Sequence, residues 1–305
     1  MKNIEKNIMD KKRIKITALI ASFFIYAGIF SQSPTSPALG FNVFVENNAT
    51  LNTNESEGSI AIGGDLILRG NYRVSIHDCG EYTVGGLKIG LLVDGKIDFG
   101  ASSNGQLYVN SNYYAKIGDG TGSKVWYTDQ NNATSPIRIT QTNNYNSSTR
   151  VMLQANATTL GNVSASNNPV IESNLIDFSA AFQAMRSSSS NIAQNVNNAQ
   201  LTNPNGQTIP NTNLPNQVKI NLQNGINYLN VTGADLNNVS VFTYNNQPSA
   251  TKILVINVDA SGTFNWNVWN QAGVGIQNAP YILYNFYNTT QLNINGNSTI
   301  EGTVF

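Results

Sequence analysis

The stretch 171-IESNLIDFSAAFQAMRSSSSNIAQNV-196 is the part of the chain whose apolar spacing fits a long helix. Its large apolar side chains recur at steps of three, four or seven positions, at Ile171, Leu175, Phe178, Phe182, Met185, Ile192 and Val196. This spacing places them on one helical face, which Ser189 alone interrupts with a polar group. We therefore predict one long helix over about residues 171–196, with either Asn168 or Ser173 as its N-cap.

The opposite face of this helix is polar and nearly uncharged, so the apolar face needs a partner surface. On both sides of the helix the sequence offers only short strands and turns. We therefore expect the helix to pack on a β structure.

Short apolar runs separated by Gly and Asp turns occupy residues 39–139. One of them repeats, since IGGDL at 62–66 recurs as VDGKI at 93–97 with apolar, turn and polar positions in register. Imperfect rungs with Gly at the corners are typical of a parallel β-solenoid, whose coils stack inward-facing aliphatic side chains. The sequence thus predicts a mainly β fold, a β-solenoid (parallel β-helix-like) with one long α-helix packed alongside.

Strand patterns resume after the helix, from about residue 217. The run KILVINV at 252–258 is almost continuously apolar, as expected for a strand buried on both faces. Residues 262–269 and 291–295 alternate between polar and apolar side chains. We interpret residues 34–305 as a single domain, with the helix inserted between two β halves.

The first 33 residues have the pattern of a signal peptide. Lys11, Lys12, Arg13 and Lys15 precede an apolar run at 16–30, and small polar residues follow. That run is shorter than the ~20 residues of a membrane-spanning helix. We predict residues 1–33 to be a signal peptide cleaved between Ala27 and Ser33, an exported protein, and no membrane span in the mature chain.

The composition excludes nucleic acid as a partner and two kinds of cysteine-based site. Lys plus Arg and Asp plus Glu number 17 each, so the net charge is zero, and only 11% of the residues are charged. Asn accounts for roughly one residue in six, against a few per cent in average usage. Without a basic stripe, nucleic acid is excluded as a partner. Cys79 is the single cysteine, which rules out an intrachain disulfide and a Cys-based zinc cluster.

Catalytic chemistry has few candidates. His77, the single histidine, is followed by Asp78 and Cys79, but adjacent side chains of an extended segment point to opposite faces. Paired carboxylates of a polysaccharide-degrading enzyme are the alternative, because neighbouring rungs could bring together Asp65, Asp94 and Asp98. Aspartates at Gly-Asp turns usually stabilise the turn by accepting backbone hydrogen bonds. The segment 118-GDGTG-122 has a single carboxylate, which is too few ligands for a calcium site. We therefore expect no catalytic residue, no cofactor and no metal.

Aromatic side chains are the candidate ligand contacts. They gather in two places, at Tyr113, Tyr114, Trp126 and Tyr127 and at Trp266 and Trp269. Exposed rings beside Asn and Thr suit sugar or protein surfaces, although plain core packing is the alternative. A flat Thr-x-Thr or Thr-x-Asn ladder, which would indicate ice binding, is not evident in this pattern.

Several blocks in order resemble the choice-of-anchor A domain of exported bacterial proteins, which is also described as an adhesive domain. They are LGFNVFV at 39–45, EGSIAIGGD at 57–65, IDF at 176–178, YLNV at 228–231, residues 253–258 with Gly262 and Trp266, ILYNF at 282–286 and GTVF at 302–305. The resemblance implies a secreted or surface module with a solenoid-like body and a helix beside it, and it brings no established catalytic residues. The sequence ends at Phe305 without an LPxTG-like motif, which leaves a fragment, a short reading frame and a freely secreted form open.

Together these features predict a secreted or cell-surface, non-catalytic binding or adhesion module. Its neutral Asn, Thr and aromatic face would recognise an extracellular glycan or protein surface. A polysaccharide-degrading enzyme on a β-helix scaffold and an ice-binding-like protein are the alternatives.

Overall fold

The computed structural model describes residues 33–77, 80–296 and 298–305. The predicted signal peptide lies outside these residues except for Ser33, and so do Asp78 and Cys79. Residues Pro37–Phe305 form one compact unit, and the following account concerns this unit.

The fold is mainly β, with two α-helices in the described residues. The helical elements are η1 (Ser36–Ala38), α2 (Phe178–Ala193), α3 (Gly233–Asn238) and η2 (Ala279–Tyr281). The strands before α2 are β1 (Val43–Val45), β2 (Ala49–Leu51), β3 (Asn54–Glu55), β4 (Ile60–Ile62), β5 (Leu66–Leu68), β6 (Tyr72–Val74), β7 (Thr83–Val84), β8 (Leu87–Val93), β9 (Gln106–Val109), β10 (Tyr114–Ile117), β11 (Ser123–Trp126), β12 (Pro136–Gln141) and β13 (Arg150–Asn156). The strands after α2 are β14 (Gln200–Thr202), β15 (Thr208–Ile209), β16 (Gln217–Asn221), β17 (Gly225–Thr232), β18 (Val241–Tyr244), β19 (Lys252–Asp259), β20 (Gly262–Asn267), β21 (Asn270–Ala272), β22 (Ile282–Asn285), β23 (Thr289–Asn295) and β24 (Thr303–Val304).

Before α2, equivalent short strands of successive turns of the chain pair in parallel. The ladders run β1-β4-β8-β10, β2-β5 and β3-β6-β9-β13, while β7, β11 and β12 add antiparallel pairs. The sequence repeat is confirmed in register, since Ile62 pairs with Val93 and Leu66 pairs with Ile97. A pattern visible in two short blocks therefore marks real neighbours in space.

The corner between β4 and β5 shows why small residues recur in this repeat. A Cβ added at Gly63 would overlap the carbonyl oxygen of Glu46 and the ring of Phe178. The backbone of one turn thus approaches the next, and the helix above it, too closely for a side chain.

After α2 the parallel ladders are β16-β18-β21, β17-β19-β22-β24 and β20-β23. β14 and β15 extend the first of them in antiparallel fashion. The apolar run at 252–258 is β19, and residues Leu254 to Val258 within it are buried, as predicted. The strands before α2 and the strands after it have separate hydrophobic cores. The first core is built from β1–β13 and the second from β14–β24.

Helix α2 is shorter than the sequence pattern indicates. It spans Phe178–Ala193 instead of 171–196, and its N-cap is Asp177, whose side chain accepts a hydrogen bond from the Ala180 amide. The predicted caps Asn168 and Ser173 lie in a non-helical segment that precedes the helix. Asn174 has a left-handed φ of +59°, which no helix interior tolerates. Past the other end, Val196 is 84% exposed and lies outside the apolar stripe.

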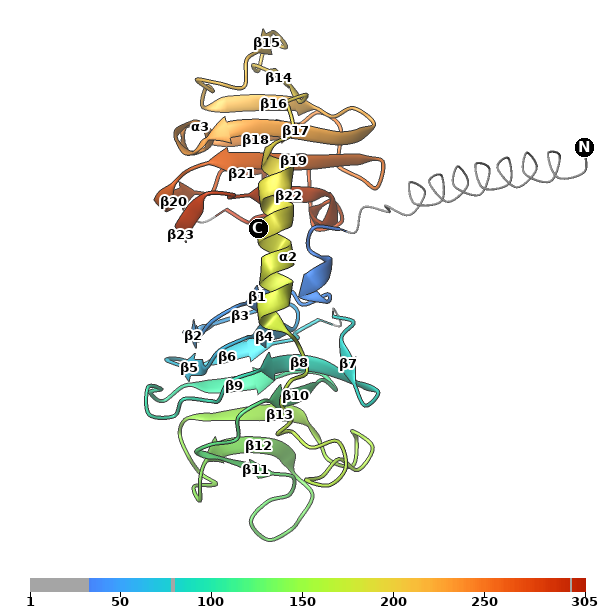
Figure 1. Ribbon diagram of the computed structural model, residues 1–305, viewed down its shortest axis with the longest axis vertical. Helices are drawn as coiled ribbons and strands as arrows, with labels where there is room; N and C mark the ends of the chain where they lie inside the picture. Colours follow the sequence, from blue (N-terminus) through green and yellow to red (C-terminus); the bar gives the residue numbers. More distant parts are fainter. Residues whose placement is uncertain (1–32, 78–79, 297) are drawn as a thin grey trace, which may run out of the picture. The chain divides into compact units, whose positions relative to one another are not determined.

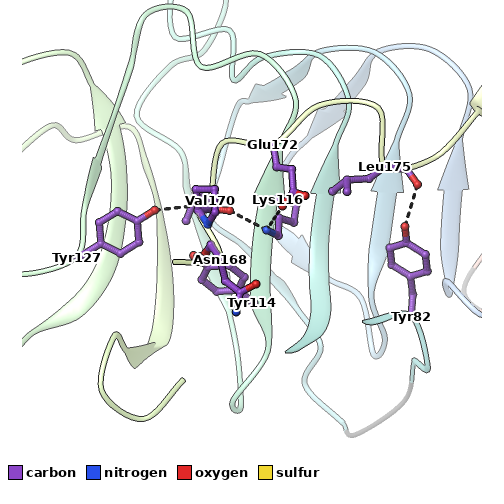
Figure 2. A network of polar contacts seen from close by, with 9 residues as sticks. Tyr82, Tyr114, Lys116, Tyr127, Asn168, Val170, Glu172 and Leu175 are labelled. Carbon is purple, nitrogen blue, oxygen red and sulfur yellow. Dashed lines mark hydrogen bonds and ion pairs between the residues drawn. The ribbon is translucent and has the colours of Figure 1, made fainter. Parts of the chain in front are cut away.

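Residues 168–176, the tether segment, stay out of the helix because they find partners on the β structure. Ile171 forms a parallel bridge with Ile117, through hydrogen bonds that flank it on both sides. Figure 2 shows side chains of the β region reaching this segment. These contacts are Tyr114 Oη to Asn168 O (2.8 Å), Lys116 Nζ to Pro169 O (2.8 Å) and to the Glu172 carboxylate, Val170 N to Tyr127 Oη (2.9 Å), and Tyr82 Oη to Leu175 O (3.0 Å). Strand-like pairing and side-chain bonds outweigh the helical periodicity here.

The first turns of α2 lie on β1. Phe44 stacks on Phe178 and Phe182, with ring centroids 4.9 and 5.3 Å apart, and Arg186 forms an ion pair with Glu46. Apolar contact on a β structure, as predicted, therefore anchors this end of the helix.

The later turns of α2 lie beside β22 (Figure 1). Asparagine side chains of β17, β19 and β22 connect the helix to these strands. We call Asn230, Asn257 and Asn285, which pair across β17, β19 and β22, the asparagine ladder. Asn285 Nδ2 donates to Asn257 Oδ1 and Asn257 Nδ2 donates to Asn230 Oδ1, both at 2.9 Å. Each ladder residue also donates from its Nδ2 to a backbone carbonyl of the helix or of the residues just after it. Asn285 donates to Ser189 O, Asn257 to Ile192 O and Asn230 to Asn195 O. Ser189, the polar interruption of the stripe, donates to Asn285 Oδ1 at 2.6 Å.

Two buried tyrosines of the second core make stability sensitive to alkaline pH. Burial raises the pKa of Tyr244 and of Tyr284 above the ordinary value of 10.0. Above pH ~10 the unfolded chain loses these hydroxyl protons while the folded chain keeps them. The free energy of unfolding therefore falls as the pH rises, and each tyrosine contributes up to ~1.4 kcal/mol per pH unit. Urea midpoints at pH 8, 10 and 11 should therefore decline above pH ~10. Tyr244→Phe should decline less steeply, and a flat wild-type profile through pH 11 would contradict the prediction.

Candidate functional site

Strands β20 and β23 present a regular row of polar side chains on their outer face. They pair in parallel, with Thr263 opposite Gln291, Asn265 opposite Asn293 and Asn267 opposite Asn295. The alternate side chains point the other way, and Trp266 among them is fully buried. We call these six outward residues the amide face.

Hydrogen bonds keep the amide face in order. Asn293 Nδ2 donates to Asn265 Oδ1 at 2.8 Å across the two strands. On the other side of β20, Asn237 of α3 donates to Asn265 O at 2.8 Å and accepts from Asn267 N at 2.9 Å. Helix α3 thus continues the row beside β20, where a third strand would otherwise lie.

The amide face is a neutral grid of donors and acceptors. Its six residues carry no charge, and each amide both donates and accepts hydrogen bonds. Neighbouring positions are ~4.8 Å apart across the strands and ~6.8 Å apart along them. Such a surface can bind extended neutral partners through many weak hydrogen bonds, with little electrostatic steering.

The comparison with protein families covers all the strands before and after α2. Residues 34–305 match the family model described as Putative Ice-binding-like adhesive domain. The chain belongs to this family. The match supports the adhesive part of the resemblance drawn from the sequence, although the matching family does not carry the choice-of-anchor A name. No curated protein and no solved structure matches the chain.

Four of the six aromatic residues predicted to contact a ligand in this adhesive domain are buried. Trp266 and Trp269 are 0% and 1% exposed and pack against Tyr284 in the second core. Tyr113 and Tyr114 are 2% and 0% exposed. Since a buried ring cannot touch an external partner, this part of the prediction is corrected, and these rings stabilise the fold.

The other two aromatic residues remain partly accessible. Trp126 Nε1 donates to Thr140 Oγ1 at 2.9 Å, and the Trp126 ring meets Tyr145 edge-on at 5.1 Å. Tyr127 accepts a hydrogen bond from Val170 and so helps to hold the tether segment. Ligand contact at Trp126 and Tyr127 stays a prediction.

The carboxylates considered for glycoside cleavage serve different purposes in the adhesive domain. Asp98 Oδ1 accepts from Ala101 N at 3.0 Å and closes its own turn. Asp65 Oδ1 accepts from Lys96 N at 3.0 Å and so joins two paired segments of the chain. Asp94 lines a separate hollow beside Asp177 and Glu46, and Glu46 is paired with Arg186.

The remaining candidates for chemistry lie apart. His77 is exposed and contacts the Glu57 carboxylate at 2.9 Å. The hydrogen bond from Thr121 lowers the pKa of Asp119, which closes the turn at 118–122. Over residues 33–77, 80–296 and 298–305, no three His, Cys, Asp or Glu side chains gather closely enough to hold a metal ion. None of the helices in the described part of the chain is both long and apolar enough to cross a membrane.

The amide face itself was missed by the sequence reasoning. The signal was present, because Thr263-x-Asn265-x-Asn267 and Gln291-x-Asn293-x-Asn295 share one alternation 28 residues apart. Only Thr263-x-Asn265 is a Thr-x-Asn step, so the expectation that no regular Thr-x-Asn ladder exists is not contradicted. Only the strand pairing shows that the two segments are neighbours.

Proposed function

We propose that this chain is an exported, non-catalytic adhesive module that binds an extracellular glycan or protein surface through the amide face. Its body is a β-solenoid, each ladder being one side of a stack of coils. Export depends on the predicted signal peptide at 1–33.

The parallel ladders support the solenoid. The same two sets of neighbours recur, since β17, β19 and β22 pair in one ladder while β16, β18 and β21 pair in another. Stacked coils of this kind bury their aliphatic side chains and turn alternate positions outward. The amide face is one such row of outward positions.

A non-catalytic role is supported by how the candidate acids are used. Asp65 accepts a hydrogen bond from the backbone amide of Lys96 in the neighbouring segment, and Asp98 accepts one from the Ala101 amide of its own turn. Glycoside cleavage needs two carboxyl groups that face each other across the scissile bond. These two carboxylates accept hydrogen bonds from backbone amides instead.

The observation that carries the proposal is the neutral, ordered amide face in an adhesive-domain family. Interfaces of this kind gain affinity from paired hydrogen bonds and lose it when an unpaired charge is buried. A charge of either sign should therefore weaken binding.

We expect the paired substitutions Thr263→Lys with Asn267→Lys, and Thr263→Glu with Asn267→Glu, to lower adhesion at least ~10-fold, a loss of ~1.4 kcal/mol. The assay is binding of the purified protein to glycan arrays and matrix proteins. Asn131→Lys and Asn131→Glu, in an exposed turn, are the matched controls and should bind as the wild type does. Retained binding in both double variants, or loss with one sign only, would argue against a neutral partner at this face.

Ice binding is the second candidate, favoured by the even spacing of the grid and by the family description. In this case the wild-type protein should produce thermal hysteresis and the two double variants should not. Absence of hysteresis in the wild type removes this candidate and leaves the adhesive proposal in place.

A further inference from the structure

A small hollow lies where α2 ends. It has a volume of about 220 Å³ and is bordered by Ala193, the last residue of the helix, and by the loop residues Asn211 and Thr212. The carboxyl ends of β17 and β19 supply Thr232 and Asp259. We call it the helix-end pocket.

Three side chains of different polar chemistry line the helix-end pocket. Thr232 pairs with Asp259 across β17 and β19. Tyr287 lies in the turn that follows β22 and lines the same pocket. Burial raises the pKa of Tyr287 and the Asp259 carboxylate raises it further, in keeping with their proximity. The Thr232 hydroxyl and the Asp259 carboxylate thus stand on strands ~4.8 Å apart, and the Tyr287 ring lines the same pocket.

The groups of this pocket are fixed before any ligand arrives. Asp259 Oδ1 accepts from Asn288 Nδ2 at 2.6 Å, which leaves Oδ2 for a ligand. Asn211 Nδ2 donates to Asn230 O at 2.7 Å and so turns its Oδ1 to other partners. The floor contains Asn230 and Asn257 of the asparagine ladder, which are locked by their own bonds. Preorganised side chains lose little entropy on binding.

The charge of the pocket selects among ligands. Asp259 is the charged residue of the lining, and no Lys or Arg borders the pocket. The carboxyl end of α2 adds a partial negative charge. Phosphates, sulfates and uronates are therefore disfavoured, while hydroxyl donors gain a charge-assisted hydrogen bond to the carboxylate.

We infer that the helix-end pocket binds one neutral hexopyranose unit of a glycan. Vicinal hydroxyls of the sugar donate to Asp259 Oδ2 and Asn211 Oδ1, and the C–H face of the ring lies on Tyr287, which is 36% exposed. The volume is below the ~300 Å³ of typical ligand pockets, so a single ring fits and a chain does not. The biological use of such a site rests on the proposed adhesive function, although binding of the sugar does not.

The test is a titration of the full-length chain with methyl glycosides of glucose, galactose and mannose, followed by saturation-transfer NMR and calorimetry. We expect at least one of them to bind with a Kd of ~1 mM, as suits a small ligand in an open site. Asp259→Asn and Tyr287→Ala should each weaken binding at least ~10-fold. Asp119→Asn, an exposed turn aspartate elsewhere, is the matched control and should change nothing; if Tyr287→Ala unfolds, Asp259→Asn decides.

The inference is overturned if no neutral glycoside binds, if both variants bind as the wild type does, or if galacturonic acid or glucosamine binds more tightly than the neutral sugars. The two proposals fail separately. Loss of monosaccharide binding with adhesion intact removes the pocket alone. The double variants of the amide face should keep monosaccharide binding even where adhesion is lost.

Discussion

Replacing Glu172 by Gln should lower the free energy of unfolding by ~3 kcal/mol, one of the two largest single effects we expect in this protein. Lys116 is 0% exposed, and its ammonium is satisfied by the Glu172 carboxylate and by Pro169 O. Without the carboxylate the buried positive charge keeps Pro169 O and the Tyr114 ring, 5.6 Å away, but no negative partner among the described residues. The cost is that of an uncompensated buried charge and not the modest value of a surface ion pair.

Urea unfolding of four proteins measures this effect: the wild type, Glu172→Gln, Lys116→Met and the double variant. The double variant should be more stable than Glu172→Gln, because no buried charge remains and Met fills much of the volume of Lys116. Glu81→Gln, at an exposed position, should change stability by less than ~0.5 kcal/mol. If Glu172→Gln changes the free energy of unfolding as little as Glu81→Gln does, the Glu172 carboxylate does not compensate the buried charge of Lys116.

Replacing Asn257 by Leu should cost ~3 kcal/mol and loosen the second half of α2. Asn257 is the middle member of the asparagine ladder and is 2% exposed. The substitution removes its bonds to Asn230, Asn285 and the Ile192 carbonyl, and Asn230 Oδ1 loses its donor in a buried place.

Hydrogen exchange distinguishes loosening of the helix from general destabilisation. In Asn257→Leu the amides of the last two turns of α2 should exchange faster than in the wild type, while those of the first turns, held by Phe44, change less. Asn227→Leu is the matched control, because Asn227 is equally buried but donates to Gln223, Gly225 and Ile253. It should cost stability without a local effect on α2. Equal exchange along α2 in both variants would show that the ladder does not anchor the helix.

Sequence reasoning recovered the features that depend on local spacing. It gave the mainly β class, the buried run of β19, the existence of α2 and the register between residues 62–66 and 93–97. It placed the helix start seven residues too early, because Ile171 and Leu175 continue the helical period but find partners on the β structure.

The candidate site was harder to predict than the fold. Trp266 and Asn265 are neighbours in an alternating strand, and nothing local says that the tryptophan faces the core and the amide faces solvent. Likewise Asn257 and Asn293 are both strand asparagines, yet one is buried under a helix and the other belongs to the amide face. Their roles depend on which strands lie beside them.

The sequence by itself determined where strands and the helix form, because backbone geometry fixes periods of two and 3.6 residues within a few neighbouring positions. Tertiary structure alone decided which asparagines support α2, which face outward, and where the helix begins. Those outcomes depend on pairings between residues 28 to 96 positions apart, such as Asn265 with Asn293 and Ser189 with Asn285. Over such distances the chain's local pattern carries no information about partners, and the free energy of burial and hydrogen bonding makes the choice.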